Sequence, residues 1–271
     1  MKLSEVYKIA DGLAPKRLSD EYCAVFGAYD NSGLLVEACE EVKGILFSLD
    51  LTNAAIEKAI EKGCNLIITH HPAIYGKIGD IRMGDNKLLG GKLVRCIQNG
   101  ISVICMHLNL DMAKDGIDES LMQGILHSSG AGTGLTTEPA IMHPLQDGGY
   151  GRAYDMQECT LSALAENMKK TFATERILTY GERENTVKRV ASFCGAGVDE
   201  SSIAFAAREG AQVLVSSDFK HHLIALALEL GMSVVILTHY ASENYGFKKY
   251  YEKICRQVEI PCVYHTEDNL L

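Results

Sequence analysis

Three short segments of the sequence carry histidine and carboxylate side chains at spacings that suit metal binding. Imidazole nitrogens combined with carboxylate oxygens favour zinc, manganese, iron and similar ions, whereas magnesium and calcium prefer oxygen alone. If the three segments meet in space, they provide enough imidazole and carboxylate ligands for a site with two metal ions. The side chains are the adjacent pair His70 and His71, then His107 and Asp111, and then His239 and Glu243.

The first segment, "THHPAIY", places two imidazoles directly after an apolar run. Pro72 keeps His71 out of helical geometry. In extended backbone, neighbouring side chains point to opposite sides, so His70 and His71 are expected to diverge. This arrangement suits two different metal ions better than one ion held by both rings.

The other two segments depend on the local backbone. If 107–111 stays extended, His107, Asn109 and Asp111 share one side. His239 and Glu243 are four residues apart and converge if helical geometry begins at His239. A helix surface often carries such a pair without any function, and a lone histidine beside a strand usually makes a structural hydrogen bond. We expect that structural role for three other histidines, His127, His143 and His265.

A common site is favoured because each segment directly follows an apolar run rich in β-branched residues. Such runs predict strands that are buried on both faces, as in a parallel sheet covered by helices. They span 44–49, 65–69, 101–106, 212–217 and 232–237. Between them, amphipathic segments predict helices, three of which are closed by a glycine. The predicted helices are 51–63, 86–99, 200–209, 220–230 and 242–256. The fold class is therefore α/β, with polar side chains at strand ends that can meet.

Composition excludes several classes of protein. The 271 residues, 47% of them hydrophobic, are enough for one large or two smaller cores. No apolar run approaches the roughly 20 residues that span a bilayer, and no export signal is visible, so we expect a cytoplasmic protein. A net charge of −9 without a basic run disfavours nucleic-acid binding. The nine cysteines form no C-x-x-C pair and are expected to be buried free thiols in a reducing compartment.

Two domains are expected. The stretch 126–140 is rich in Gly, Ser and Thr and predicts a linker or domain crossing. Segments 45–71 and 191–222 both read strand, polar turn, helix, strand and a tail that ends in His-His, which suggests duplication. We assign 1–127 plus 233–271 to a discontinuous metal-binding α/β domain and 128–232 to a second α/β domain.

These segments resemble the signatures of a dinuclear-metal family, GTP cyclohydrolase I type 2, also called the Nif-three-like family. The similarity includes "THHPAIY", "HLNLD", "THYASE", "YDNSGL" with Tyr29 for the family's tryptophan, "FCGAG", and "SSDFKHH" with Ser217 for the family's glycine. The resemblance implies that His107, Asp218, Lys220 and His222 line the cleft. It implies the metal ligands His70, His71, Asp111, His239 and Glu243.

The resemblance also implies two similarly folded α/β domains with mainly parallel sheets, a metal site in the cleft between them, two divalent metal ions per chain and a homohexameric ring. Two ions about 3.5–4 Å apart can share a water and lower its pKa, which gives hydrolysis without a nucleophilic side chain. His107, His222 and Lys220 are the candidates for acid or base.

If the substrate is GTP, the reaction opens the purine's five-membered ring and releases formate on the way to dihydroneopterin triphosphate. Lys220 and Arg152 are the expected protein contacts of the triphosphate. "FCGAG" predicts a tight turn rather than a dinucleotide fingerprint, because Glu200 stands where the third glycine belongs. Two alternatives stay open: another metal-dependent hydrolase, acting on a phosphoester or a cyclic amide-like bond, and a non-enzymatic metal-binding scaffold.

Overall fold

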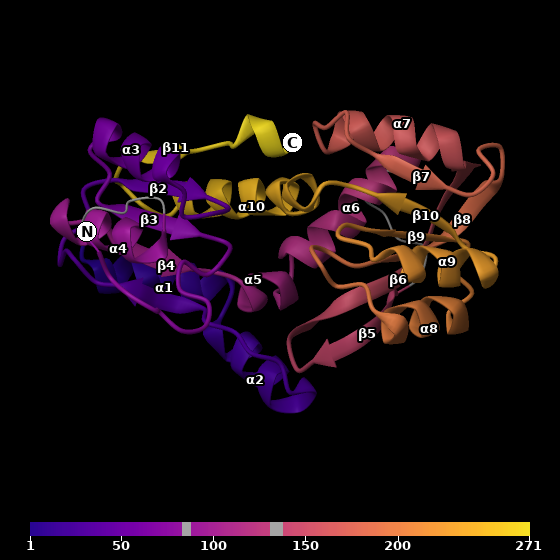
Figure 1. Ribbon diagram of the computed structural model, residues 1–271, viewed down its shortest axis with the longest axis horizontal. Coiled ribbons are helices and arrows are strands. Elements are labelled where there is room, and N and C mark those ends of the chain that lie inside the picture. The colour runs from indigo at the N-terminus through magenta and orange to yellow at the C-terminus, as the bar shows by residue number, and fades with distance from the viewer. Residues whose placement is uncertain (83–87, 131–137) are drawn as a thin grey trace. The chain divides into compact units, whose positions relative to one another are not determined.

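The computed structural model describes residues 1–82, 88–130 and 138–271, which form two compact units (Figure 1). Unit 1 contains residues 1–113 and 247–266, and unit 2 contains residues 114–246 and 267–271. The chain passes from one unit to the other after residues 113, 246 and 266, whereas the sequence predicted boundaries at 127/128 and 232/233. The reason is that helix α6 (Ile117–Ser129) packs on elements of unit 2, as do the first turns of α10 (His239–Cys255).

Unit 1 is built on a five-stranded sheet with the order β1-β4-β3-β2-β11. Only β1 runs antiparallel to its neighbour, so β2, β3, β4 and β11 all end at the same edge. The strands are β1 (Gly33–Val36), β2 (Ile45–Ser48), β3 (Leu66–Thr69), β4 (Ser102–Cys105) and β11 (Cys262–Tyr264).

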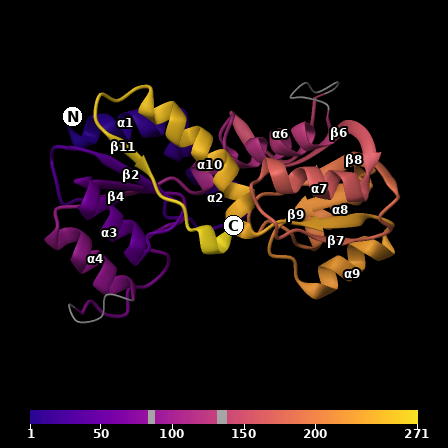
Figure 2. The same cartoon turned by 90° about the horizontal axis from the view of Figure 1, so that it is seen from above.

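Helices cover both faces of this sheet, with α3 and α4 on one face and α1 and α10 on the other (Figure 2). Helix α3 begins where the Thr52 hydroxyl accepts a hydrogen bond from the Ala55 backbone N–H, and it ends at Gly63 in left-handed conformation. The helices of unit 1 besides α10 are α1 (Leu3–Leu13), α2 (Lys16–Phe26), α3 (Asn53–Lys62), α4 (Leu89–Gln98) and the short α5 (Leu108–Met112).

Unit 2 contains a six-stranded mixed sheet with the order β5-β6-β8-β9-β10-β7. Within the described chain, only β8, β9 and β10 are parallel to one another. The expectation of a mainly parallel sheet is therefore correct for unit 1 and wrong for unit 2. A two-residue turn at Gln146 and Asp147 joins β5 to β6, and so short a connection permits only antiparallel pairing. The strands are β5 (Ala140–Leu145), β6 (Gly148–Thr160), β7 (Leu178–Tyr180), β8 (Thr186–Ser192), β9 (Val213–Ser216) and β10 (Ser233–Ile236).

Two helices cover each face of this second sheet, α6 and α7 on one and α8 and α9 on the other (Figure 1). Helix α6 continues to Ser129, so the first part of the expected linker at 126–140 is helical, and residues 131–137 lie outside the described residues. The remaining helices are α7 (Leu161–Thr171), α8 (Glu200–Arg208), α9 (His221–Glu229) and the 3-10 turn η1 (Asp268–Leu270).

The expected core elements are confirmed. All five apolar runs are strands, and a helix lies in each of the five amphipathic segments. The units share a strand–helix–strand arrangement, β2-α3-β3 in one and β8-α8-β9 in the other, each with parallel strands. Among the residues that the structure describes, no helix combines the length and the apolar character needed to cross a membrane.

The cysteines are all free, but their expected burial is only partly correct. Four are buried, whereas the other five are partly exposed because they lie at helix ends, loops and edge strands. The partly exposed cysteines are Cys23, Cys39, Cys159, Cys255 and Cys262.

Substitution of Ile67 tests the core of unit 1. Ile67 on β3 is fully buried against Leu46 and Val103, so Ile67→Ala removes three methyl or methylene groups and leaves a cavity. We expect a loss of about 2–5 kcal/mol in the free energy of unfolding, measured by urea denaturation. The matched change Ile60→Ala, on the exposed side of α3, should cost less than about 1 kcal/mol. Equal losses from both variants would contradict this account of the core.

Candidate metal centre

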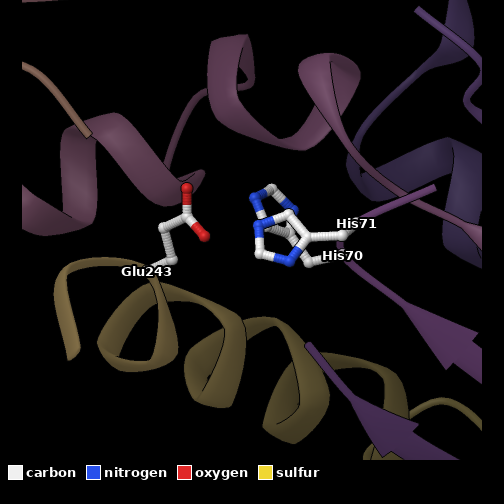
Figure 3. A group of neighbouring side chains, drawn as sticks. All are labelled: His70, His71 and Glu243. Carbon is white, nitrogen blue, oxygen red and sulfur yellow. The ribbon is translucent and has the colours of Figure 1, made fainter. Parts of the chain in front are cut away.

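Strand β3 ends at Thr69 and delivers His70 and His71 to the carboxyl edge of the sheet (Figure 3). The expectation that the two rings diverge is wrong. Their centroids are 5.0 Å apart with an interplanar angle of 46°. The backbone N–H groups of both residues donate to the Leu49 carbonyl, at 3.1 and 2.8 Å, so the chain has left regular extended geometry where the histidines stand.

His107 and Asp111 reach the same edge from the end of β4. The sequence suggested an extended segment here. Instead, the segment forms the short helix α5, in which the Asp111 N–H donates to the His107 carbonyl at 2.9 Å. Residues four apart share a helix face, so the two side chains still lie together. Asn109 points elsewhere, and its side-chain N–H donates to the Ala14 carbonyl at 2.6 Å. This hydrogen bond between distant parts of the chain holds Asn109 away from His107 and Asp111, which favours a helical turn over an extended segment.

Within unit 1 these side chains form one compact cluster. His70 Nε2 lies 3.5 Å from Asp111 Oδ1, and the His70 and His107 ring centroids are 5.3 Å apart. The three residues each offer a ligand atom, and these atoms lie within 4.8 Å of one another. His70 is completely buried. The set of two imidazoles and one carboxylate could hold a metal ion.

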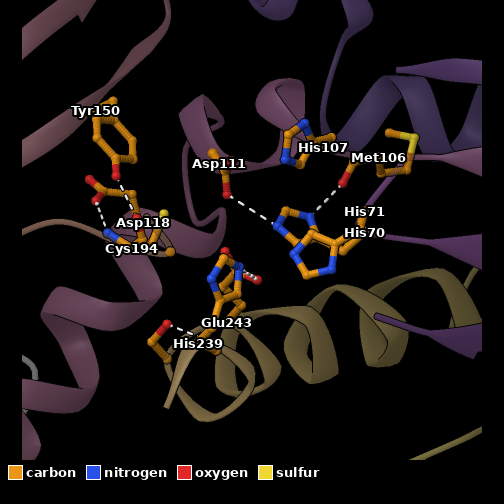
Figure 4. A network of polar contacts seen from close by, with 12 residues as sticks. His70, His71, Met106, His107, Asp111, Asp118, Tyr150, Cys194, His239 and Glu243 are labelled. Carbon is orange, nitrogen blue, oxygen red and sulfur yellow. Dashed lines mark hydrogen bonds and ion pairs between the residues drawn. The ribbon is translucent and has the colours of Figure 1, made fainter. Parts of the chain in front are cut away.

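The hydrogen bond of the first histidine fixes which nitrogen faces Asp111. His70 Nδ1 lies 2.8 Å from the Met106 carbonyl oxygen (Figure 4). Because a carbonyl oxygen can only accept, Nδ1 carries the proton, and in the neutral ring Nε2 presents its lone pair. Nε2 and the Asp111 carboxylate are then two acceptors directed at each other, an arrangement that a cation stabilises.

His71 and His107 also have an acceptor on Nδ1, which in both cases is a carboxylate oxygen. His71 Nδ1 lies 2.9 Å from Asp50 Oδ1, and His107 Nδ1 lies 2.7 Å from Asp30 Oδ1. A carboxylate that accepts from Nδ1–H fixes the ring orientation and leaves Nε2 as the ligating nitrogen, as is usual behind metal-bound histidines. Sequence analysis missed Asp30 and Asp50. Their only sequence signals are that Asp30 lies within "YDNSGL" and that Asp50 follows β2 at the edge where His70 follows β3.

Asp30 is held as a carboxylate by its surroundings. Burial raises the pKa of this carboxyl, but a hydrogen bond from His107 opposes that effect. The hydroxyls of Ser19 and Ser32 donate to its other oxygen, each at 2.5 Å. Together these bonds outweigh burial and hold the pKa of Asp30 well below its usual value. Asp30 therefore acts as a fixed acceptor for His107.

Unit 2 contains a similar pair at the start of α10. The helix begins at His239, three residues before the predicted start at 242, so the condition for the pair to converge is met, and His239 Nε2 lies 3.1 Å from Glu243 Oε2. His239 Nδ1 lies 2.5 Å from Asp218 Oδ2. His239 thus has a carboxylate on Nδ1 and presents Nε2 next to a second carboxylate, which is the pattern seen in unit 1.

The "FCGAG" turn forms the surface on which Glu243 packs. Gly195 has φ of +58°, and a Cβ atom at this position would lie 2.4 Å from Glu243 Oε1 and 3.5 Å from His239 Cε1. The Gly195 carbonyl accepts a 2.6 Å hydrogen bond from the Ser217 hydroxyl. The turn therefore needs glycine both for its conformation and for the approach of the carboxylate.

A buried ion pair anchors this turn. Asp118 accepts hydrogen bonds from the backbone N–H groups of Gly151 and Cys194 and from the Arg152 guanidinium (Figure 4). The Tyr150 hydroxyl donates to the Cys194 carbonyl at 2.5 Å. Arg152 is 3% exposed and engaged by Asp118, so its predicted contact with a substrate triphosphate is wrong. Its role is structural.

The remaining predicted residues lie outside these clusters. Lys220 and His222 are exposed at the start of α9 in unit 2, and nothing measured in the structure assigns them a chemical role. Of the described residues, the groups able to hold a metal do not include His127, His143 or His265. Burial lowers the pKa of His143, which favours its neutral form.

Known proteins resemble this chain over nearly its whole length. It matches the family described as Duf34/NIF3 (NGG1p interacting factor 3) over residues 1–269. A Clostridium acetobutylicum relative named GTP cyclohydrolase 1 type 2 homolog is 30% identical over 245 residues, which cover 90% of this chain and 85% of the relative. The solved structure of reduced HcgD from Methanocaldococcus jannaschii is 28% identical, with a TM-score of 0.77 over 97% of each chain. A Bacillus cereus protein related to NIF3 covers 98% of this chain and 97% of its own at a TM-score of 0.79 and 19% identity, which shows the fold alone.

Gly195→Ala tests the packing of Glu243 on the turn. Gly210→Ala is the matched control, because Gly210 also has positive φ but would place its Cβ in open space. Both variants should lose about 1 kcal/mol in the free energy of unfolding from backbone conformation. Gly195→Ala should lose at least about 1 kcal/mol more, because the Glu243 carboxylate must move. Urea denaturation measures both, and identical losses would show that the contact carries no energy.

Proposed function

The chain belongs to the Duf34/NIF3 family, and from that premise we propose that it is a dinuclear metal-dependent hydrolase of the GTP cyclohydrolase I type 2 kind. The observation that carries the proposal is the shared arrangement of four histidines. Each has Nδ1 bound to an oxygen acceptor, and each presents Nε2. The pairs are His70 with Met106, His71 with Asp50, His107 with Asp30 and His239 with Asp218.

The side chains fit a pair of divalent ions by their chemistry. Imidazole nitrogens mixed with carboxylates suit zinc, manganese, iron or similar ions. The two acceptors His70 Nε2 and Asp111 Oδ1, 3.5 Å apart, repel each other unless a cation joins them. The proposed ligands are His70, His71, Asp111, His239 and Glu243.

The last two proposed ligands lie on helix α10 in unit 2, where they pair an imidazole Nε2 with a carboxylate. The helix is one continuous element whose first turns belong to unit 2 and whose later turns belong to unit 1. Within unit 1, the Phe247 ring lies 6.1 Å from the His70 ring. Glu243 precedes Phe247 by four residues, so it lies one turn away on the same helix face.

Each of the surrounding side chains has its own role in the proposed reaction. When bound, two such ions lower the pKa of a shared water and supply a hydroxide at neutral pH. Asp30 and Asp50 hold the rings of His107 and His71 in one tautomer. His107 is not in the proposed ligand set, so its Nε2 can accept or return a proton as the substrate reacts. Lys220 stays as a proposed contact of the substrate's phosphates, and His222 stays as an alternative acid or base.

GTP is the proposed substrate because a relative that covers most of the chain carries the cyclohydrolase name. Ring opening and formate release consume two waters, and closure of the pterin ring returns one, so GTP and one net water give formate and dihydroneopterin triphosphate. The protein's own charge is −9, so the triphosphate depends on local positive charge. Bound cations and Lys220 supply that charge in this proposal.

Metal content tests the ligand set directly. Gently purified protein incubated with zinc or manganese and then desalted should retain about two ions per chain by elemental analysis. Asp111→Asn keeps the side-chain shape but weakens a ligand, so it should retain fewer, as should His70→Ala. His143→Ala, outside the cluster, should retain as many as the wild type. A wild-type chain that binds no added ion would remove the basis of the proposal.

Turnover of GTP tests the reaction. The loaded protein should release formate and produce a fluorescent pterin after oxidation, and Glu243→Gln should lower kcat/KM by about 100-fold or more. Asp30→Asn should lower it by about 10–100-fold with metal retained, because a neutral amide accepts more weakly from His107 Nδ1 than a carboxylate does and can present its NH2 group instead, which favours the other tautomer. Phosphate release without formate would instead assign a phosphoesterase. Full metal binding with no turnover on a panel of nucleotides and cyclic amides would assign a scaffold.

A further inference from the structure

Two tyrosine rings contact each other on the surface of unit 1, close in the chain to residues of the histidine cluster. Tyr29 and Tyr75 are 57% and 60% exposed, and their ring centroids are 5.4 Å apart at an interplanar angle of 69°. Single exposed apolar side chains are common on proteins, whereas two exposed rings in contact leave a larger continuous apolar area in water. The pair is therefore a candidate binding surface.

The pairing of two strands places the first tyrosine near the cluster. Strand β1 runs antiparallel to β4, so the residues before β1 lie beside the residues after β4. The His107 N–H accordingly donates to the Ser32 hydroxyl at 3.2 Å. Tyr29 directly precedes Asp30, whose carboxylate accepts from His107 Nδ1 at 2.7 Å. Tyr29 thus belongs to the segment that orients a histidine of the cluster.

The second tyrosine is held by the chain that follows β3. Tyr75 follows His71 by four residues. Ile74 packs against the core of unit 1, and its backbone carbonyl accepts a 2.7 Å hydrogen bond from the Asn31 side-chain N–H. That bond fastens the chain after β3 to the chain before β1. Both rings therefore stand on connected segments, which reduces the conformational entropy lost when a ligand binds.

We propose that Tyr29 and Tyr75 form a stacking platform for a planar heteroaromatic ring of the substrate, whose edge then lies toward the histidine cluster. This inference rests on the proposed function, under which the ring is the purine base of GTP. Aromatic side chains stack on the π-face that every base presents, so the platform binds the ring without reading its hydrogen-bonding groups. Its contribution to affinity is independent of the charge on the triphosphate.

Two probes separate binding of the ring from binding of the phosphates. The nucleotide 8-oxo-GTP has oxygen in place of the hydrogen that formate would carry, so it cannot release formate, and inorganic triphosphate has no ring. Isothermal titration calorimetry gives the dissociation constant of each probe for the zinc-loaded chain. Tyr29→Ala and Tyr75→Ala should each weaken binding of 8-oxo-GTP by about 10-fold and that of inorganic triphosphate by less than about 2-fold.

Conservative variants test whether the ring or the hydroxyl is responsible. Tyr29→Phe and Tyr75→Phe keep the aromatic face, so both should bind 8-oxo-GTP within about 2-fold of the wild type. The alanine variants should keep the wild-type zinc content and the wild-type midpoint of urea denaturation, because the substituted rings are exposed. Equal losses of affinity for both probes would show that the substitutions act on the metal centre and would overturn the inference.

Fluorescence gives a direct readout of stacking, because the chain contains no tryptophan. In the Tyr29→Trp variant the single indole can be excited selectively, and 8-oxo-GTP should quench it saturably with the dissociation constant found by calorimetry. Inorganic triphosphate should leave the emission unchanged. Tyr180→Trp is the matched control, since Tyr180 is an exposed tyrosine on β7 of unit 2, and it should show no saturable quenching.

The inference is overturned if the wild type does not bind 8-oxo-GTP, or if both alanine variants bind it as tightly as the wild type. It is also overturned if Tyr29→Ala changes the number of subunits, measured by light scattering, with both dissociation constants unchanged, because the pair is then a contact between copies of the chain. Failure of the proposed function is a separate result. A chain that needs both rings to bind 8-oxo-GTP but releases no formate from GTP has the platform without the cyclohydrolase activity.

Discussion

The hydrogen bond between His70 Nδ1 and the Met106 carbonyl is the interaction on which the candidate site depends. It exists because β3 and β4 are parallel neighbours in a register that pairs Thr69 with Cys105, so the residues that follow both strands emerge side by side. The Met106 N–H donates in turn to the Thr69 carbonyl at 2.9 Å, which continues the ladder past the strand ends. The sheet thereby fixes a proton on one nitrogen and a lone pair on the other nitrogen of a completely buried ring.

Unit 2 also positions a histidine next to a carboxylate, His239 next to Glu243, but a turn rather than a sheet supports the pair. There the rigid element is the turn at Gly195, held by Asp118 and by hydroxyl groups rather than by a ladder of strands. A buried ion pair such as Asp118 with Arg152 is costly to desolvate, and it is tolerated when further hydrogen bonds satisfy the charges. The N–H groups of Gly151 and Cys194 provide these bonds. Asp118 thus stabilises the surface on which Glu243 packs.

Sequence reasoning located the five strands β2, β3, β4, β9 and β10 and the histidines that follow three of them, because apolar β-branched runs and their polar tails are local signals. It failed where a contact distant in sequence decides the structure. The backbone at 107–111 is helical, and Asn109 bonds to Ala14 there, which no local pattern reveals. The carboxylate Asp30 acts on His107 from 77 positions away along the chain. Strands β5 and β7 of unit 2 also escaped, since they are edge strands that lack a continuous buried run.

A proton could in principle replace a metal ion between His70 and Asp111, because an imidazolium would donate to the carboxylate. The other rings argue against that solution. His70, His71 and His107 have centroids 5.0 to 6.0 Å apart, and three imidazolium charges so close together would repel one another strongly in a partly buried site. Every Nδ1 already has an oxygen acceptor, which leaves each Nε2 as the nitrogen that can bind a cation. A divalent cation would satisfy Nε2 lone pairs and a carboxylate at once without protonating any ring, which supports the proposed metal site over a bridging proton.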